Sequence, residues 1–280
     1  MKTVVVGLGL IGGSIARRLR GFKDTKIIGI DIDQRTLDMA MSDGVIDEGY
    51  TDGSVIKDAD FILLCLYPER NVEFIKKYCK DLKKGAVITD VSGVKRFVID
   101  SIKDVIPDDV DFVGGHPMAG RETGGYQSST DTLFDGASYL ITPTPDNSAE
   151  AIALVREFAE YIGCVHIVTT TPKEHDAIIA YTSQLMHIVA IALCDNPMIE
   201  RSTYFSAGSL RDCTRVAVIN EKMWSELFLE NKDELSMRIE EMQDSLEKIK
   251  EALKNDDRNK LEDIMKDATY KKLKWLSEKM

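Results

Sequence analysis

The fold of this chain is decided by Thr3-Val4-Val5-Val6-Gly7-Leu8-Gly9-Leu10-Ile11-Gly12-Gly13-Ser14. A run of β-branched residues stops at Gly7 and a helical pattern follows, so the stretch predicts a strand, a tight turn and a helix. Gly7, Gly9 and Gly12 have the G-x-G-x-x-G spacing of a dinucleotide-binding turn. In such a turn the first glycine permits the bend, the second leaves room for a pyrophosphate, and the third lets helix and strand pack closely.

The residues after the turn extend this prediction to a whole cofactor. Leu10 and Ile11 open the helix, whose free N–H groups and positive dipole end suit phosphates, so both join the glycines as expected cofactor-binding residues. A second expected strand, 26–30, ends at Asp31, about 20 residues after the last glycine, where an acidic side chain would hold the ribose hydroxyls. No Lys or Arg stands directly beside Asp31, although Arg35 is near, which favours NAD over NADP. The alternative is a glycine-rich turn in an unrelated α/β fold.

Composition and charge restrict the class of protein. The chain has 280 residues, of which 44% are hydrophobic, so it is long enough for two globular domains. A net charge of −11 argues against nucleic acid as a partner and requires local positive groups for any anionic substrate. No apolar run approaches the roughly 20 residues of a membrane span and no signal peptide is evident, so we expect a cytoplasmic protein without a membrane partner. The five cysteines and four histidines show no metal-ligand spacing, so no metal is expected.

Expected strands and helices alternate up to about residue 170. This order predicts a parallel, doubly wound sheet, that is, a Rossmann-type dinucleotide-binding domain over residues 1–170. The expected strands after the first two are 60–66, 86–91, 112–113, 138–142 and 165–168. The expected helices between them are 34–42, 69–82, 95–105 and 148–162.

Residues 171–280 contain no convincing strand, and we expect them to form an all-α domain. Long helices are expected at 173–194, 223–231, 232–254 and 258–279. The last two carry apolar residues at spacings of three and four, which is typical of a packing face. Helices of this length need a partner surface, so we expect a homodimer through the helical domain. The alternative is packing within one chain.

Two segments should bring polar groups to the ligand-binding edge of the sheet. Ligands of an open parallel sheet bind beyond the carboxyl ends of its strands, where 90–95 and 114–122 are expected. His116 stands there between two glycines and a proline, on an expected loop. Its ordinary pKa near neutrality suits a proton acceptor beside a nicotinamide. The alternative is a structural histidine that only caps the turn.

The helical domain offers a histidine and two arginines. Asp176 and His187, together with two residues between them, have spacings of four, three and four and should share one helix face that points toward the sheet edge. Arg211 and Arg215 stand in one short segment, and a guanidinium can bind a carboxylate through two hydrogen bonds. The alternatives are a packing histidine and solvated surface charges.

Several of these motifs, taken in order, closely resemble the prephenate dehydrogenase family. The match covers almost the whole chain, and Gly-His-Pro-Met-Ala-Gly followed by Glu122 is its most specific part. The matching segments are 4–14, 90–95, 114–122, 174–176, 183–187, 211–215 and 223–231. The resemblance implies an NAD-dependent oxidative decarboxylation of prephenate to 4-hydroxyphenylpyruvate in tyrosine biosynthesis.

The resemblance also implies a role for each matching residue. His116 would accept the hydroxyl proton of the substrate as hydride leaves the ring, and Ser92 would hydrogen-bond that hydroxyl or His116. Arg215 would bind a substrate carboxylate, with Arg211 in the same segment, and His187 would help to hold the substrate. Glu122 would lie at the pocket mouth in an ionic network with the arginines.

Two departures from the family pattern leave substrate choice open. Gln184 stands where the family often has a histidine, and Arg121 stands where a small hydroxyl residue is common. Arogenate, the amino-acid version of prephenate, is therefore the close alternative substrate. A non-catalytic NAD-binding sensor on the same scaffold is the alternative from another class.

Overall fold

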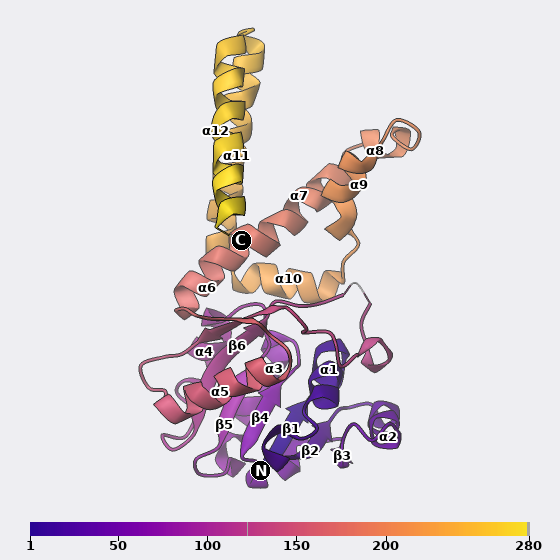
Figure 1. Cartoon of the computed structure of the whole chain (residues 1–280), viewed down its shortest axis with the longest axis vertical. Coiled ribbons are helices and arrows are strands. Elements are labelled where there is room, and N and C mark those ends of the chain that lie inside the picture. The colour runs from indigo at the N-terminus through magenta and orange to yellow at the C-terminus, as the bar shows by residue number, and fades with distance from the viewer. Residues whose placement is uncertain (122, 279–280) are drawn as a thin grey trace. The chain divides into compact units, whose positions relative to one another are not determined.

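The computed structural model describes residues 1–121 and 123–278. It contains two compact units, Met1–Lys232 and Asp233–Met280 (Figure 1). The first unit holds the sheet together with the helices that directly follow it along the chain. The domain boundary expected near residue 170 stays a prediction.

One mixed sheet of eight strands forms the centre of the first unit. Its spatial order is β3-β2-β1-β4-β5-β6-β7-β8, with β1 between β2 and β4, so the strand order reverses beside β1. Such a reversal is the point where open α/β sheets bind ligands. The strands are β1 (Lys2–Val6), β2 (Lys26–Ile30), β3 (Glu48–Tyr50), β4 (Phe61–Leu64), β5 (Val87–Asp90), β6 (Asp111–Pro117), β7 (Ser138–Thr142) and β8 (His166–Thr169).

The expected fold class is confirmed, with one correction to strand direction. All neighbouring strands are parallel except β6 and β7, which are antiparallel with Gly115 opposite Ile141 and His116 opposite Leu140. The reason lies in the connection between them. Outside residue 122, the described part of that connection contains the short 3-10 turn η4 (Tyr126–Ser128) and no crossover helix of the kind that a parallel neighbour requires. The short edge strand β3 was not expected from the sequence.

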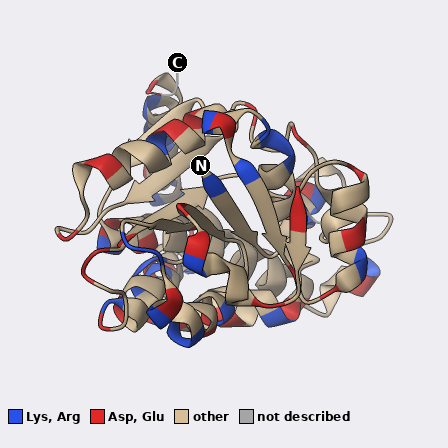
Figure 2. Cartoon of the chain, turned by 90° about the horizontal axis from the view of Figure 1, so that it is seen from below, with Lys and Arg blue, Asp and Glu red and all other residues tan. Residues whose placement is uncertain are grey.

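Helices cover both faces of the sheet. The helices of the first unit are α1 (Leu10–Arg18), α2 (Gln34–Ser42), α3 (Pro68–Tyr78), α4 (Arg96–Ile102), α5 (Ala149–Tyr161), α6 (Pro172–Ile179), α7 (Leu185–Cys194), α8 (Met198–Arg201), α9 (Gly208–Thr214) and α10 (Glu221–Glu230). Asp33 caps α2, because its carboxylate accepts a hydrogen bond from the backbone N–H of Arg35. Within the face seen in Figure 2, Lys and Arg alternate with Asp and Glu, and neither sign of charge dominates.

Two apolar cores lie on opposite sides of the sheet. Successive strand residues alternate between them, as the pleat of a strand requires: Val5 packs in one core while Val4 and Val6 pack in the other. Residues of α1, α2 and α5 complete the first core, and residues of α3 and α4 complete the second. Strands buried on both faces explain the continuous apolar runs of the sequence.

The long helix expected at 173–194 is present but interrupted. A π-helical turn, η5 (Ala180–Gln184), joins α6 to α7 and breaks the 3.6-residue period on which the shared face of Asp176 and His187 was predicted. By length and composition, Pro172–Cys194 is apolar enough to cross a membrane, with a mean hydropathy of 1.8, and 28% of that window is buried. The expectation that no apolar run approaches this length is therefore wrong for this helix.

The second unit is a pair of long helices. They are α11 (Lys232–Lys254), which starts at the last residue of the first unit, and α12 (Arg258–Ser277), close to the ranges expected from the sequence. Among its described residues α12 buries none, yet Tyr270, Leu273 and Trp275 are large and apolar. This unit thus presents apolar surface that its own residues leave uncovered.

Candidate active site

The glycine turn between β1 and α1 has the shape that a dinucleotide needs. A Cβ atom on Gly12 would lie 1.9 Å from the carbonyl oxygen of Gly7, and Gly7 itself has φ +90°, so both positions require glycine. A Cβ atom on Gly9 would meet nothing within 4 Å, which leaves open space above the turn. Gly9 is also the N-cap of α1 and makes no side-chain cap, so the first N–H groups of the helix face that space. These residues fit the pyrophosphate of NAD.

Asp31 lies beside the same turn. Its Oδ2 accepts a hydrogen bond of 2.8 Å from the backbone N–H of Leu8, and its Oδ1 accepts one of 3.0 Å from the N–H of Asp33. The carboxylate is thereby held at the end of β2, next to the first glycine of the turn. Its predicted role toward the ribose hydroxyls remains a prediction.

His116 lies within β6, not on a loop as the sequence suggested. The two glycines before it were interpreted as loop residues, but the structure gives them a steric reason. A Cβ atom on Gly114 would lie 2.3 Å from Thr142 Oγ1, and one on Gly115 would lie 2.3 Å from the hydroxyl oxygen of Tyr139. Glycine therefore lets β6 pair closely with β7 and carry a partly exposed His116 to its end.

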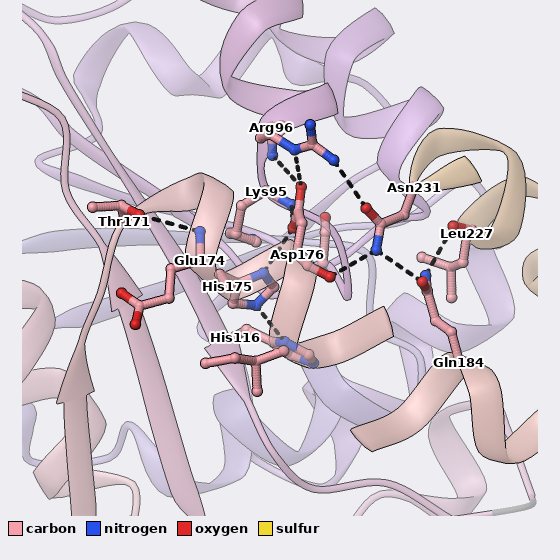
Figure 3. Close-up of polar contacts among 12 residues, drawn as sticks. Lys95, Arg96, His116, Thr171, Glu174, His175, Asp176, Gln184, Leu227 and Asn231 are labelled. Carbon is pink, nitrogen blue, oxygen red and sulfur yellow. Dashed lines mark hydrogen bonds and ion pairs between the residues drawn. The ribbon is translucent and has the colours of Figure 1, made fainter. Parts of the chain in front are cut away.

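His116 is the outer member of a row of three polar side chains (Figure 3). Its Nδ1 lies 2.9 Å from Nε2 of His175, and Nδ1 of His175 lies 2.8 Å from Oδ1 of Asp176. His175 and Asp176 come from α6 and are 1% and 0% exposed. The relay, as we call His116, His175 and Asp176, joins a strand end to the helix that follows the sheet.

The carboxylate of Asp176 accepts hydrogen bonds from every side. Oδ1 accepts from the backbone N–H of Lys95 at 2.8 Å, while Oδ2 accepts from the N–H and Nε of Arg96 at 2.9 and 3.2 Å. Asp176 thus caps the start of α4, which has no side-chain cap of its own. Although burial opposes it, the hydrogen bonds from His175, Arg96 and Lys95 lower the pKa of Asp176, so the group is an ionised acceptor.

These contacts determine which ring nitrogens carry protons. An ionised Asp176 requires a proton on Nδ1 of His175, which leaves Nε2 of that neutral ring as an acceptor. Nδ1 of His116 must then be the donor to it, so Nε2 of His116 keeps its lone pair. Burial first, and then repulsion from any proton shared with His175 and from the charge of Lys95, hold the pKa of His116 well below 6.5, and burial also lowers the pKa of His175. His116 is therefore a neutral imidazole with a free acceptor nitrogen.

A buried ion pair lies behind this row. Nζ of Lys95 donates to Asp90 Oδ1 at 2.6 Å and to the carbonyl oxygen of Gly115 at 2.6 Å, and both side chains are fully buried. Asp90 also accepts from the backbone N–H groups of Gly115 and Ser92. The pair therefore ties the end of β5 to the residue that precedes His116.

Ser92 follows β5, at the strand end next to that of His116. Its hydroxyl oxygen accepts a hydrogen bond of 3.1 Å from Nδ2 of Asn71, whose own side chain is anchored to the backbone of Leu66. Because Asn71 supplies the donor, the hydroxyl proton of Ser92 is free to be donated. The structure thus brings Ser92 and His116 to adjacent strand ends.

His187 and Arg215 form a separate group on the helices after the sheet. Nδ1 of His187 lies 2.8 Å from the carbonyl oxygen of Val216, and its ring stacks on Trp224 with centroids 3.6 Å apart. Burial lowers the pKa of His187; the hydrogen bond to Val216 opposes this shift, and the nearby charge of Arg215 adds to it. The nitrogen that donates to Val216 leaves Nε2 as an acceptor. Arg211 is exposed and its Nε lies 3.5 Å from Oδ1 of Asp212.

Glu122, expected at the pocket mouth, lies outside the described residues. The roles predicted for it and for the other site residues therefore remain predictions. What the structure supplies is their grouping: the glycine turn with Asp31, the strand ends with Ser92 and His116, and the helical pair of His187 and Arg215.

The sequence analysis missed the residues behind His116. His175 and Asp176 were visible in a family motif, but their spacing assigned them no function. Asn231 and Gln184 were missed as well: Nδ2 of Asn231 donates to the carbonyl oxygen of Asp176 and to Oε1 of Gln184, and Nε2 of Gln184 donates to Leu227. No local signal marks such a network, because its members come from α6, η5 and the end of α10.

Family models match almost the whole chain. The model described as "Prephenate dehydrogenase, nucleotide-binding domain" matches residues 15–168, and the one described as "Prephenate dehydrogenase, dimerization domain" matches residues 171–267. The first match begins after the glycine turn, so the turn is independent evidence for a dinucleotide.

Curated relatives and solved structures agree with these models. The chain is 31% identical to a prephenate dehydrogenase of Bacillus subtilis, over 92% of this chain and 71% of the relative. It is 30% identical to a cyclohexadienyl dehydrogenase of Zymomonas mobilis, over 96% and 94%. Its fold is similar to that of an A. aeolicus prephenate dehydrogenase in complex with hydroxyphenyl propionate and NAD+, with a TM-score of 0.88, 33% identity and 98% of each chain covered. A Synechocystis arogenate dehydrogenase is also similar, with a TM-score of 0.86, 28% identity, and 98% and 100% covered.

Proposed function

This chain belongs to the prephenate dehydrogenase family, and on that premise we propose that it oxidises prephenate with NAD, using His116 as the proton acceptor. The products are 4-hydroxyphenylpyruvate, CO2 and NADH. The observation that carries the proposal is the free Nε2 of a neutral His116, fixed by its hydrogen bond to His175 at the edge of the sheet.

The reaction requires two things of the protein: a base, and groups that bind the two carboxylates of the substrate. Bound NAD supplies the hydride acceptor. His116 takes the proton from the ring hydroxyl while the carbon that bears this hydroxyl gives up its hydrogen as hydride, so that the oxygen becomes a carbonyl conjugated with the ring carbon that bears a carboxylate. The C–C bond to that carboxylate then breaks, CO2 leaves, and the electron pair makes the ring aromatic.

The former hydroxyl oxygen of the substrate both loses and regains a proton. Loss of CO2 leaves that oxygen as a phenolate, and His116 can return to it the proton that it removed. Prephenate and NAD+ therefore become product, CO2 and NADH with no net proton release. His116 has to hold the proton only for the time between the two steps.

The helical groups would hold the substrate. Arg215 offers a guanidinium to a carboxylate, and Nε2 of His187 is left as an acceptor because Nδ1 of that ring contacts the carbonyl oxygen of Val216. Ser92 can donate its hydroxyl proton to an oxygen of the substrate or to His116. Arg211 and Glu122 remain candidates for the pocket mouth.

We also infer a homodimer. Residues 171–267 match a dimerization-domain model. The apolar helix Pro172–Cys194 and the exposed apolar residues of α12 are surfaces that a second copy of the chain could bury. Since the relatives are biosynthetic enzymes, we expect the protein to act in the cytoplasm.

Steady-state rates test the function directly. The purified protein is assayed with prephenate and with arogenate, each with NAD and with NADP, by the absorbance of the reduced cofactor. We expect the highest kcat/KM for prephenate with NAD. A higher value with arogenate would mean that arogenate is the substrate. No turnover with either substrate would favour the alternative of a non-catalytic NAD-binding sensor.

A further inference from the structure

We propose that His175 and Asp176 are positioning residues that fix the tautomer of His116, so that its Nε2 faces the substrate without a proton. The inference rests on the proposed function, because it explains how the base of that reaction is kept ready. It adds two residues of α6 to the machinery of a reaction whose base stands on the sheet.

The first step is the carboxylate of Asp176, whose state is fixed by its surroundings. Two of its hydrogen bonds come from backbone N–H groups, those of Lys95 and Arg96, and a backbone amide can only donate. A third comes from the guanidinium of Arg96, which is always protonated. Both carboxylate oxygens of Asp176 therefore act as acceptors, and the carboxylate carries no proton.

The second step passes this constraint along the relay. His175 has one nitrogen facing an obligate acceptor, so that nitrogen must be the donor and the other must be the acceptor. His116 faces that acceptor through Nδ1 at 2.9 Å. The order of donors runs in one direction only, from His116 to His175 to Asp176, and leaves Nε2 of His116 free.

The third step is the exclusion of water. His175 is 1% exposed and Asp176 is 0% exposed, so solvent cannot supply an alternative donor or acceptor inside the relay. An unpaired polar atom in such a place is unfavourable, because it has lost its hydrogen bonds to water without gaining a partner. The opposite tautomer of His116 would place two N–H groups, or two lone pairs, against each other at one of the two contacts.

The relay positions the proton acceptor and does not conduct the proton away. Within the described residues, the partners of the Asp176 carboxylate beyond His175 are the N–H groups of Lys95 and Arg96, which donate and cannot accept a proton. The proposed chemistry also needs no exit, because the proton returns to the product oxygen. The ionised Asp176 stabilises the imidazolium of His116 while it lasts, through the hydrogen bonds of His175.

The test measures the tautomer and the rate in the same variants. Asp176→Asn can place an amide N–H opposite Nδ1 of His175, which reverses both histidines and puts a proton on Nε2 of His116. We expect kcat to fall by roughly 10²–10⁴-fold, the usual worth of a general base, with little change in NAD affinity. His175→Phe should also lower kcat, and His175→Gln should recover part of it, since the amide oxygen can accept from Nδ1 of His116.

Nitrogen-15 NMR of histidine-labelled protein reads the tautomers. The chain has four histidines, so single replacements assign every ring. We expect a protonated Nδ1 and a bare Nε2 for His116 in the unmodified protein, and a protonated Nε2 in Asp176→Asn. His166→Gln, an exposed change on β8, is the matched control and should alter neither the spectrum of His116 nor kcat.

The outcomes separate this inference from the proposed function. Near-normal turnover of His116→Asn would show that His116 is not the base and would contradict the proposed function. A low rate for His116→Asn, together with an unchanged His116 tautomer in both Asp176→Asn and His175→Phe, would overturn the relay alone. Should Asp176→Asn fail to fold, the spectrum and rate of His175→Phe and His175→Gln decide the question.

Discussion

The ring of His116 is neutral and has a hydrogen-bond partner at Nδ1. Burial and the nearby positive charge of Lys95 keep the ring unprotonated, while His175 fixes the orientation of the ring. A lowered pKa makes a weaker base, but one that is always in the right protonation state. The surroundings of His116 thus keep its ring in the protonation state that the proposed proton transfer requires.

The pH dependence of catalysis should show this state. Because the pKa of His116 lies well below 6.5, kcat/KM for prephenate should already have reached its plateau at that pH and fall only in more acidic solution. The profile of log kcat/KM against pH measures this. An acidic limb centred at or above 6.5 would contradict the assignment.

Replacing His116 by Asn tests the base itself. The amide is too weakly basic to take the hydroxyl proton, so we expect kcat to fall by roughly 10²–10⁴-fold. NAD binding, followed by titration, should stay close to that of the unmodified protein, because the glycine turn is untouched. A loss of NAD affinity equal to the loss of rate would mean a folding defect.

Glu230 is a buried carboxyl group without a partner in the described part of the chain. Burial, followed by the charges of Glu226, Glu69 and Asp176, raises its pKa to about 8. Between its ordinary value of 4.5 and about 8, the folded state keeps a proton that the unfolded state has lost. Raising the pH through this window therefore destabilises the protein.

Glu230→Gln should remove that penalty. We expect the Tm of the variant to exceed that of the unmodified protein above about pH 8, and the difference to vanish below about pH 5. Thermal unfolding across this range measures it. A constant difference at every pH would point to packing in place of charge.

At the scale of elements, the turn between β1 and α1 divides its glycines into two kinds. Gly12 is needed for the fold, since its Cβ would collide with the backbone of Gly7, whereas Gly9 has room for a side chain in the structure itself. The open space above Gly9 can therefore hold a bound ligand.

Two alanine variants separate these roles. Gly12→Ala should lower the free energy of unfolding by about 1–3 kcal/mol, the usual cost of overpacking. Gly9→Ala should leave stability almost unchanged but weaken NAD binding at least about tenfold, because its methyl group would occupy the place of the pyrophosphate. Denaturant unfolding and NAD titration of both variants measure this. A Gly9→Ala protein with normal NAD affinity would move the cofactor away from the turn.

The π-helical turn η5 shows how an element can serve two sites. It lies between α6, which carries His175 and Asp176, and α7, which carries His187. Gln184 within it is buried and joined to Asn231, which in turn contacts Asp176 and Arg96. The family histidine that Gln184 replaces is thus exchanged here for a residue of the network behind the base.

At the scale of the whole molecule, the described apolar surface exceeds what one chain covers. In α12, Leu261, Met265, Leu273 and Leu276 are separated by four, eight and three positions, so they lie along one stripe of the helix. Leu273 is 62% exposed within this chain. A second copy of the chain would give such a stripe a partner.

A single charge in the stripe should weaken the dimer. Leu273→Glu should raise the dimer dissociation constant at least about tenfold, the effect of about 1.4 kcal/mol. Gln243→Glu, which adds the same charge at an exposed polar position of α11, is the control and should leave it unchanged. Sedimentation velocity over a range of concentrations measures both. Equal constants for the two variants would place the interface elsewhere.

Local pattern alone determined the class of fold and the prediction of where the cofactor binds. The glycine spacing, the β-branched runs and Asp31 each act through neighbours in the chain, because a tight turn, a buried strand and a helix start depend on nearby residues. The same holds for the cap at Asp33 and for the long helices near the end. The family motif was equally local, and it named His116 without showing what lies behind it.

Tertiary structure decided the strand that holds His116, the direction of β7 and the relay. Gly114 and Gly115 were interpreted as loop residues because glycine favours turns, whereas the structure uses their small size against Tyr139 and Thr142. His175 lies 59 positions from His116 in the chain, and Asp176 lies 81 from Lys95. Protonation of a buried ring depends on partners brought from such distances, and no local spacing can encode them.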